Sequence, residues 1–317
     1  MLVIGTRGSK LALWQAHHIR DRLIMAHPGL EVRLEIIKTS GDRIQDRALY
    51  EVGGKGLFVK EIEEALLDGR IDFAVHSMKD VPGQMPPGLT LGAMTQRADP
   101  FDALIATGGL TLEELPEGAK VGTGSLRRKF QLLQARPDLE VLSIRGNVDT
   151  RLQKLRDGLG GLEAIVLAVS GLTRLDLAGV ITDRLTSPTF LPAIGQGALG
   201  LETREGDTRV ADFLLPLRHE ETEVCVAAER GVLERLEGDC HLPIACHATR
   251  DKDGTIALHA RLGLPDGSSM VEGILSGAGD PRSLGLRLGE SLLGNGGSEM
   301  MRELDEMMGN EAGSSPL

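Results

Sequence analysis

Aromatic residues, cysteines and long apolar stretches are scarce in this chain of 317 residues. Aromatic side chains account for 3% of it, with one Trp and one Tyr, too few for the stacking platforms on which single-stranded nucleic acids bind. The net charge of −11 would also repel a phosphate backbone. The composition therefore argues against a nucleic-acid partner.

The three cysteines, an odd number, form no disulfide framework and are typical of a reducing compartment. The longest uncharged stretch, residues 185–201, contains two prolines and three glycines, which a membrane span does not tolerate without neighbouring helices to repair it. Residues 1–5 begin a strand pattern at once, without the basic leader of a signal peptide. We expect a soluble, cytoplasmic protein with no membrane partner.

Apolar strand-like segments alternate with amphipathic helical segments over residues 1–190. Strands are expected at residues 2–5, 32–38, 71–75, 120–122, 139–144 and 164–169. Helices are expected at residues 9–26, 57–67, 125–136 and 148–156. This alternation predicts an α/β fold with parallel sheets joined by right-handed crossovers.

Glycine and proline concentrate near residues 95–101 and 191–198, which predicts hinges rather than regular elements. A long helix is expected over residues 219–238, because glutamates suit its start and a glycine suits its end. A small further sheet and one more helix are expected at residues 255–262, 269–275 and 281–293. The tail from residue 294, with a short helix candidate at 298–308, is expected to be peripheral.

Residues 76–82 (HSMKDVP) place ionisable and hydroxyl side chains directly after an expected buried strand. Strand ends are where α/β proteins bind ligands, because the rigid backbone there delivers side chains into a crevice. Lys79 and Asp80 put a cation beside a potential proton carrier. The alternative is a solvated turn with an ordinary ion pair.

Cations gather where strands or loops lead into helices. Residues 122–129 (GTGSLRRK) predict a glycine turn, a capping Ser125 and three cations in the first helical turn. Positive charge at a helix N-terminus costs about 0.3–1 kcal/mol per group, and an anionic ligand would reverse the sign of that cost. Alternatively, Arg127 and Arg128 extend towards surface carboxylates.

The same arrangement recurs at three further junctions. They are residues 5–10, 53–56 and 143–151, which carry Arg7, Lys55, Arg145 and Arg151 between them. Asn147 is placed to cap the helix in the last of them. Together the four junctions predict a cleft for several negative charges, with bidentate arginines favouring carboxylates or phosphates. The glycine spacing of a Walker motif is missing, so a nucleoside triphosphate is not expected.

The cysteines suggest a second kind of site. Cys225 falls on the apolar face of the helix expected at residues 219–238, which predicts a core position. Two Cys-His pairs, at residues 240–241 and 246–247, suggest zinc, but their spacing differs from the usual two-to-four-residue gaps, so no metal is expected. Acidic neighbours and a helix C-terminus make Cys240 a poor spontaneous nucleophile.

In order along the chain, these motifs resemble the porphobilinogen deaminase (hydroxymethylbilane synthase) family, and the resemblance covers essentially the whole sequence. The matching segments are residues 5–15 (GTRGSKLALWQ), 53–58 (GGKGLF), 76–82 (HSMKDVP), 124–128 (GSLRR), 145–148 (RGNV), 196–197 (QG) and 238–240 (GDC). So many ordered matches make the family the leading hypothesis.

The resemblance implies an α/β protein of three domains. The first two are arranged like a type-II periplasmic binding protein around a central cleft, and the third is a small α+β domain. The implied boundaries are residues 1–95 plus 196–214, residues 100–193, and residues 218–317, with a flexible tail from about residue 294. The first domain would carry the catalytic aspartate, the second an arginine-rich cleft wall, and the third a cofactor-bearing cysteine.

The family's reaction joins four porphobilinogen units head to tail, with loss of ammonia, into the linear tetrapyrrole hydroxymethylbilane, which hydrolysis releases for haem and corrin biosynthesis. The resemblance implies a dipyrromethane primer bound through a thioether to Cys240, not to Cys246. It also implies that Asp80 assists amine loss, stabilises the resulting cation and helps to remove the α-proton. Lys79 would neutralise nearby carboxylates of cofactor or substrate.

Each pyrrole carries an acetate and a propionate, so the growing chain accumulates negative charge. By resemblance, cofactor and substrate binding falls to Arg7, Ser9, Gln15, Lys55, Phe58, Ser77, Lys79, Thr123, Ser125, Arg127, Arg128, Arg145, Arg151, Arg174 and Gln196. Phe58 would stack on or cover a ring. Two positions depart from the family pattern: Glu51 stands where some relatives have a second lysine, and Asp239 replaces a glycine common before the cysteine.

Two other classes of function use the same features. A non-enzymatic carboxylate-binding protein of the periplasmic type would need the arginines but neither Cys240 nor Asp80. A zinc enzyme would use the Cys-His pairs. Under the family hypothesis the partner is the small molecule porphobilinogen, the protein is a monomer, and the product passes transiently to the next pathway enzyme.

Overall fold

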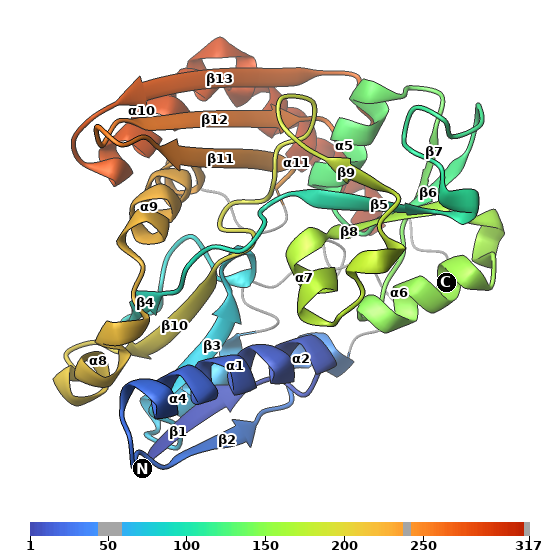
Figure 1. Ribbon diagram of the computed structural model, residues 1–317. Coiled ribbons are helices and arrows are strands. Elements are labelled where there is room, and N and C mark those ends of the chain that lie inside the picture. Colours follow the sequence, from blue (N-terminus) through green and yellow to red (C-terminus); the bar gives the residue numbers. More distant parts are fainter. Residues whose placement is uncertain (44–58, 237–241, 314–317) are drawn as a thin grey trace.

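The computed structural model describes residues 1–43, 59–236 and 242–313. Within these residues the chain forms three β-sheets, two of five strands and one of three. In Figure 1 the first sheet lies at the bottom, the second at the right and the third at the top. The sites predicted above are distributed over all three.

The first sheet has the strand order β2-β1-β3-β10-β4. Its strands are β1 (Leu2–Thr6), β2 (Val32–Ile36), β3 (Phe73–Ser77), β4 (Leu89–Met94) and β10 (Leu199–Arg204). Its helices are α1 (Lys10–Ala26), α2 (Ser40–Arg43), α4 (Lys60–Leu67) and α8 (Thr208–Leu214). β1 is parallel to β2 and β3, whereas β10 is antiparallel to β3 and β4.

The second sheet repeats this plan in the order β7-β6-β8-β5-β9. Its strands are β5 (Asp102–Ala106), β6 (Lys120–Gly122), β7 (Glu140–Leu142), β8 (Ala164–Ala168) and β9 (Asp183–Leu185). Its helices are α5 (Leu126–Ala135), α6 (Val148–Arg156) and α7 (Val169–Arg174). β6 is parallel to β7 and β8, whereas β5 is antiparallel to β8 and β9.

The chain crosses between these two sheets twice, from β4 to β5 and from β9 back to β10. In each sheet the strand that follows a crossing inserts beside the third strand of the parallel set. This exchange is the type-II periplasmic-binding arrangement, so the predicted fold class is confirmed. The expectation of parallel sheets holds for the first three strands of each five-stranded sheet, whereas β5 and β10 each enter their sheet in the opposite direction.

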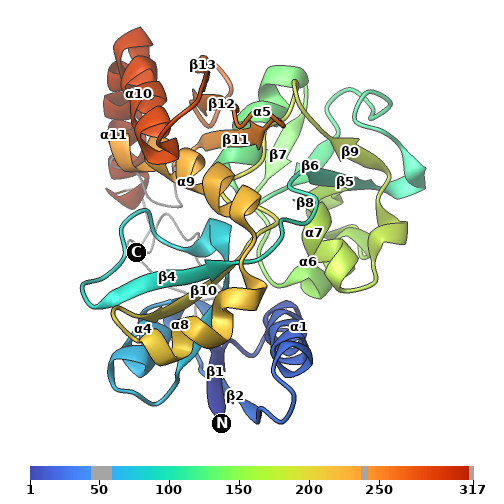
Figure 2. The ribbon, with the colours of Figure 1, turned by 60° about the vertical axis from the view of Figure 1, so that its left-hand side comes forward.

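The third sheet is antiparallel and has the order β11-β12-β13. Its strands are β11 (Ile244–Arg250), β12 (Ile256–Gly263) and β13 (Met270–Gly277). Its helices are α9 (Glu220–Arg235), α10 (Pro281–Leu292) and α11 (Ser298–Gly313). Figure 2 shows α9 lying between this sheet and the strands β4 and β10 of the first sheet.

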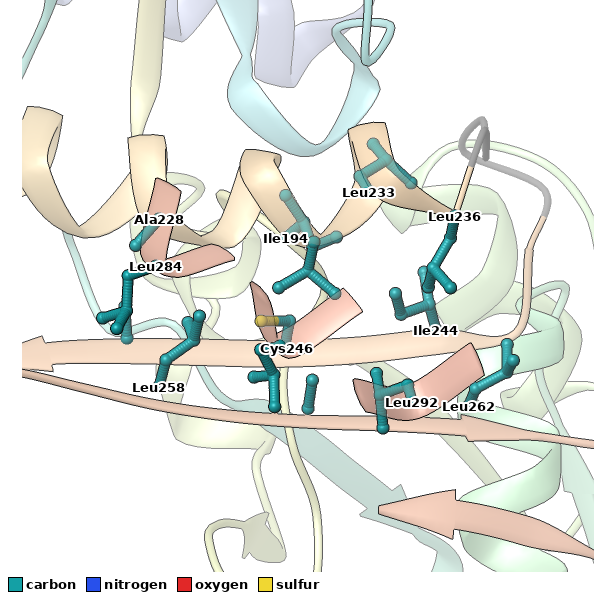
Figure 3. Close-up of a cluster of buried hydrophobic side chains, with 14 of the residues drawn as sticks. Ile194, Ala228, Leu233, Leu236, Ile244, Cys246, Leu258, Leu262, Leu284 and Leu292 are labelled. Atoms are coloured by element: carbon teal, nitrogen blue, oxygen red, sulfur yellow. The ribbon is translucent and has the colours of Figure 1, made fainter. Parts of the chain in front are cut away.

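The C-terminal helix α11 belongs to the core of the third sheet. Met300 and Leu304 are buried in the same apolar cluster as Leu258 and Cys246, and Figure 3 shows Cys246 among the leucines of α10 and the strands. The expectation that the tail is peripheral is therefore wrong, because the apolar side of α11 completes this core. The core position predicted for Cys225 is confirmed.

The helix α1 brings the end of β1 next to the end of β3. Ser9 caps it by accepting a hydrogen bond from the Ala12 amide at 3.2 Å. Ala16, Ile19 and Leu23 recur at helical spacing and pack into the core below the first sheet. Each buried Ile or Leu contributes about 1.5–3 kcal/mol. No helix in the described parts of the chain is long and apolar enough to cross a membrane.

Candidate active site

The turn after β3 carries the predicted cation and proton carrier. β3 ends at Ser77, and a 3₁₀ turn from Met78 to Asp80 follows. Met78 is buried, whereas Lys79 and Asp80 are half-buried. The turn is therefore not the solvated surface loop that was the alternative for this motif.

The second crossing segment holds this turn in place. The Met78 amide donates to the Ala198 carbonyl at 3.0 Å. Gly195 has a φ of +68° and lies so close that a β-carbon there would stand 2.7 Å from the Met78 Cβ. Only glycine combines this backbone conformation with this approach. The positions of Lys79 and Asp80 thus depend on a segment more than a hundred residues further along the chain.

A cavity opens beside this turn, where β1 and β3 end and α1 begins. It contains about 420 Å³ of empty space, including space open to solvent. Its lining residues are Arg7, Ser9, Leu11, Ala12, Gln15, Val59, Val75, His76, Ser77 and Asp80. Gln15 donates through Nε2 to the Ser77 hydroxyl at 2.9 Å. Five of the predicted site residues, Arg7, Ser9, Gln15, Ser77 and Asp80, therefore lie around one cavity.

Arg127 and Arg128 on α5 point into the protein. Arg127 Nη1 lies 2.8 Å from Asp102 Oδ2, and Arg128 Nη2 lies 2.8 Å from Asp102 Oδ1. Burial by itself would raise the pKa of Asp102, but the two guanidinium groups outweigh it and hold this pKa well below its usual range. Surface carboxylates, the alternative partners for these arginines, are not what they contact, because Asp102 is 1% exposed.

Arg128 keeps one donor unused. Its Nη1 donates to the Val166 carbonyl at 3.0 Å, but its Nε is buried with no hydrogen-bond partner among the described residues. Leaving a buried donor unsatisfied costs about 1–3 kcal/mol. Such a cost is tolerated where a ligand supplies the missing acceptor.

Gln196 links the two sheets at the centre of this region. Its Nε2 donates to Asp102 Oδ1 at 2.9 Å, and its Oε1 accepts from Lys79 Nζ at 3.4 Å. Burial lowers the pKa of Lys79 to about 8; Asp80 and Asp102 oppose this shift, and Arg128 adds to it. Lys79 therefore interacts electrostatically with the carboxylates of Asp80 and Asp102 and with the guanidinium group of Arg128.

Arg151 on α6 belongs to the same electrostatic field. Burial, Arg128 and Arg145 together lower its pKa to about 10, and Asp80 opposes the shift. Its Nε donates to the Gly146 carbonyl at 2.8 Å. Arg151, on a helix of the second sheet, is therefore within electrostatic reach of the Asp80 carboxylate of the first.

Arg174 on α7 contacts the first sheet's helix instead. Its guanidinium carbon lies 5.9 Å from the centre of the Trp14 ring, and its Nη2 donates to the Gly197 carbonyl at 2.7 Å. Burial lowers its pKa to about 10. Arg174 thus bridges α1 and the second crossing, and its partner Trp14 directly precedes the cavity residue Gln15.

The capping hydrogen bonds predicted for the starts of α5 and α6 are not formed. Ser125 and Asn147 hold the N-cap positions of α5 and α6, but neither side chain makes a capping hydrogen bond. Instead, the Ser125 amide donates to the hydroxyl of the buried Thr123 at 3.2 Å. The Ser125 hydroxyl is therefore not used to cap its own helix.

Three predicted site residues, Lys55, Phe58 and Cys240, lie outside the described residues, as do the two departures Glu51 and Asp239. Among the described residues, no group of three or more His, Cys, Asp or Glu side chains could hold a metal ion. His247, a member of one Cys-His pair, lies with its ring centre 5.4 Å from that of Phe101.

Sequence reasoning missed three buried pairings of ionisable side chains. Asp102 pairs with Arg127 and Arg128, Arg97 pairs with Glu229, and His76 pairs with Glu202. His76 stood inside a recognised motif and could have been singled out. The others had no local signal, because each pairs with a residue far away in the sequence.

Comparisons with known proteins bear on this site. Residues 2–212 match the family model "Porphobilinogen deaminase, dipyromethane cofactor binding domain", and residues 223–294 match "Porphobilinogen deaminase, C-terminal domain". The porphobilinogen deaminase of Nitratidesulfovibrio vulgaris strain Hildenborough is 51% identical over 305 residues, which cover 96% of each chain. That of Roseiflexus castenholzii is 52% identical over 301 residues, 95% of this chain and 98% of the relative.

Solved structures give a more distant likeness. A marine metagenome TRAP solute-binding protein specific for aromatic acids has a TM-score of 0.41 at 11% identity and covers 73% of this chain and 79% of its own. An ancestral arginine-binding protein has a TM-score of 0.35 at 17% identity, with 68% of this chain and 89% of its own covered. Scores this low add nothing to what the strand order establishes.

A strand-end turn that carries Lys79 and Asp80, a cavity lined by polar and charged side chains, and two sheets that exchange strands define an α/β protein of the type-II periplasmic-binding arrangement with a polar cavity. The chain belongs to the porphobilinogen deaminase family. It is a deaminating transferase of tetrapyrrole biosynthesis that joins four porphobilinogen units head to tail on a dipyrromethane cofactor and releases hydroxymethylbilane by hydrolysis. This confirms the predicted function and sets aside the non-enzymatic binding protein.

Proposed function

We propose that Asp80 is the catalytic carboxylate of this reaction. The observation that carries the proposal is its place: Asp80 lines the cavity together with Arg7, Ser9, Gln15 and Ser77. A half-buried carboxylate at a strand end is held by the backbone and is only partly screened by water. Both conditions favour the electrostatic stabilisation of a cation that forms beside it.

The residues around Asp80 fit a ligand with several carboxylates and pyrrole N–H groups. Lys79, Arg7, Arg145 and Arg151 supply cations for acetate and propionate groups. Arg127 and Arg128 are held by Asp102, and the unpartnered Nε of Arg128 is a donor that an acidic ligand can satisfy. Further binding contacts are proposed for Ser9, Gln15, Ser77, Thr123, Ser125, Arg174 and Gln196, and for Lys55 and Phe58, which lie outside the described residues.

The charges of Asp80, Lys79 and Arg151 suggest what each of these side chains does in the reaction. When bound, the dipyrromethane group would supply the pyrrole carbon that attacks the first unit, and the last ring of the growing chain would supply it for each later unit. Asp80 stabilises the cation left on the incoming substrate when its C–N bond breaks and ammonia takes the electron pair. Asp80 then accepts the proton that the new C–C bond displaces. Lys79 and Arg151 offset the carboxylates that accumulate around it.

The thioether to the cofactor is proposed for Cys240. Support comes from the other two cysteines, both buried in the third sheet's core. Burial raises the pKa of Cys225 to about 11 and that of Cys246 well above its usual value, and Glu229 adds to both shifts. Buried thiols of this kind remain protonated and are poor nucleophiles.

Asp80→Asn tests the catalytic role. We expect this variant to fold, because Asn fills the same space, and to lose at least a hundredfold in kcat, in line with the usual contribution of a general acid–base group. Intact-protein mass should still show the added dipyrrole. A kcat near that of the wild type in a protein that carries the cofactor would reject Asp80 as the catalytic carboxylate.

Intact-protein mass also tests the attachment residue. The active protein should exceed its sequence mass by two pyrrole units, and Cys240→Ser should abolish this excess. Cys225→Ala is the matched control, since it removes a thiol from the core without touching the attachment residue. A mass excess that persists in Cys240→Ser would place the thioether elsewhere.

The domain boundaries, the oligomeric state and the cellular location are also proposed. The domains are proposed to span residues 1–95 plus 196–214, 100–193 and 218–317, which is supported by the membership of the strands in three sheets. The protein is proposed to be a cytoplasmic monomer without nucleic-acid or membrane partners, supported by its net charge of −11. Light scattering on the purified protein tests the monomer.

A further inference from the structure

His76 and Glu202 form a buried pair next to the cavity. His76 lies on β3, one residue before Ser77, and lines the cavity together with Asp80. Its Nε2 is 2.8 Å from Oε2 of Glu202 on the neighbouring strand β10, and the side chains are 5% and 2% exposed. Removing ionisable groups from water is costly. A buried pair of ionisable side chains beside the proposed reaction site is therefore a candidate for a role in the reaction.

One carboxylate oxygen of Glu202 makes no hydrogen bond to the described residues. This oxygen, Oε1, is buried. An acceptor left in this state costs about 1–3 kcal/mol. A purely structural link between β3 and β10 would not need this second oxygen.

Glu63 on α4 adds another carboxyl group to the cluster. Burial, with a contribution from Glu202, raises the pKa of Glu63 to about 7, and His76 opposes this shift. Glu63 therefore lies within electrostatic reach of the His76–Glu202 pair.

The reaction needs a place for one proton per coupling. The substrate's C–N bond breaks and its electron pair leaves with nitrogen as ammonia. When the new C–C bond forms, the attacking ring carbon loses H⁺, and the electrons of that C–H bond restore the aromatic pyrrole. If Asp80 accepts this proton, it must lose it again before it can stabilise the next cation.

We propose that His76, held by Glu202, receives this proton from Asp80, directly or through a water molecule in the cavity. The Asp80 O–H bond breaks and an N–H bond forms at Nδ1, the ring nitrogen that remains because Nε2 is committed to Glu202. Ammonia then carries the proton away as ammonium, which balances the step. This inference rests on the role proposed for Asp80 and extends it.

His76→Gln separates proton transfer from structure. The Gln side-chain amide places a nitrogen near the position of Nε2 and can donate to Glu202, but it cannot take up a proton. We expect the variant to fold, to carry the dipyrrole by intact mass, and to keep its KM, while kcat falls at least tenfold. His27→Gln is the matched control, because His27 Nε2 also makes a hydrogen bond, to the Phe213 carbonyl at 3.0 Å, but is not among the residues that line the cavity.

His76→Ala provides a second readout. Added imidazole should restore kcat several-fold in this variant, where it finds space, and should not do so in His76→Gln. In ¹⁵N spectra of histidine-labelled protein, Glu202→Gln should move the ring signals that disappear in His76→Gln, which reports the pair without any turnover.

The outcomes separate this inference from the role of Asp80. A wild-type kcat in His76→Gln overturns the inference, and so does a lack of imidazole rescue in a folded His76→Ala. Loss of activity in Asp80→Asn together with normal His76→Gln leaves the proposed function standing and rejects only the proton transfer. Normal Asp80→Asn with impaired His76→Gln rejects the proposed function, and with it this transfer step.

Discussion

Arg97 and Glu229 form a two-pronged ion pair that joins the first crossing to the third sheet's helix. Arg97 Nη1 and Nη2 lie 2.6 and 3.2 Å from the carboxylate oxygens of Glu229, which is 0% exposed. The same carboxylate accepts from the Gly195 amide at 2.7 Å and from the Ala248 amide at 2.9 Å. One side chain of α9 thus holds both crossings and β11.

Removing this carboxylate should destabilise the whole protein. We expect Glu229→Ala to lower the free energy of unfolding by about 3–5 kcal/mol, because it leaves a buried guanidinium group without its partner. The midpoint of urea unfolding measures the change. Glu234→Ala is the control on the same helix: its ion pair with Arg282 is solvent-exposed and should be worth about 0–1 kcal/mol. Equal losses in the two variants would contradict this reading.

The close approach of Gly195 to Met78 should matter for catalysis as well as for stability. Gly195→Ala adds a β-carbon 2.7 Å from the Met78 Cβ and should displace the turn that carries Asp80. We expect a fall in kcat of at least tenfold, since small misplacements of catalytic groups have large effects on rate.

Gly206→Ala is the control for backbone strain. Gly206 has a φ of +76°, close to the +68° of Gly195, but nothing lies within 4 Å of its added β-carbon. Both variants should lose about 1–2 kcal/mol of stability to the left-handed backbone, and Gly195→Ala should lose a further ~1–3 kcal/mol because its β-carbon overlaps Met78. A similar fall in kcat in both would show that strain, and not the contact with Met78, is responsible.

The charge of Lys79 should make substrate capture sensitive to alkaline pH in protein that lacks the cofactor. Because burial lowers the pKa of Lys79 to about 8, its ammonium is charged below that pH and loses its charge above it. Attraction for carboxylates is therefore full near pH 7 and declines towards about pH 9. The rate of dipyrrole assembly on apoprotein, followed by mass against pH, measures this decline.

Lys79→Arg isolates the contribution of this residue. A guanidinium group stays charged over the whole range, so the variant should assemble the dipyrrole with a flatter pH profile. An unchanged alkaline decline in Lys79→Arg would assign the effect to another group.

Most helices could be predicted from the chain alone. The amphipathic repeat and Ser9 marked α1 to within one residue, and α6 was predicted with its observed bounds. The short strands β5 and β9 were missed. Their neighbours in the sheet come from distant parts of the chain, so no local pattern identifies them.

Some residues of the candidate site could be identified from the sequence, whereas the partners of others could not. Asp80, Ser77, Gln15, Ser9 and Arg7 were each visible as a polar residue at a strand or helix end, and they line one cavity. Arg127 and Arg128 of α5 were predicted to bind an anionic ligand. Their carboxylate partner is Asp102, at the start of β5 and 25 residues before Arg127 in the chain, which local spacing could not reveal.

The sequence by itself determined the family, the reaction and the polar residues available for it, because side-chain chemistry and helix periodicity are local properties. Only the tertiary structure decided which charges neutralise one another. The Arg97–Glu229 ion pair and the His76–Glu202 hydrogen bond each join residues more than a hundred positions apart in the chain. They form only when the sheets exchange strands and water is excluded from between the partners, and this exclusion strengthens the attraction between them.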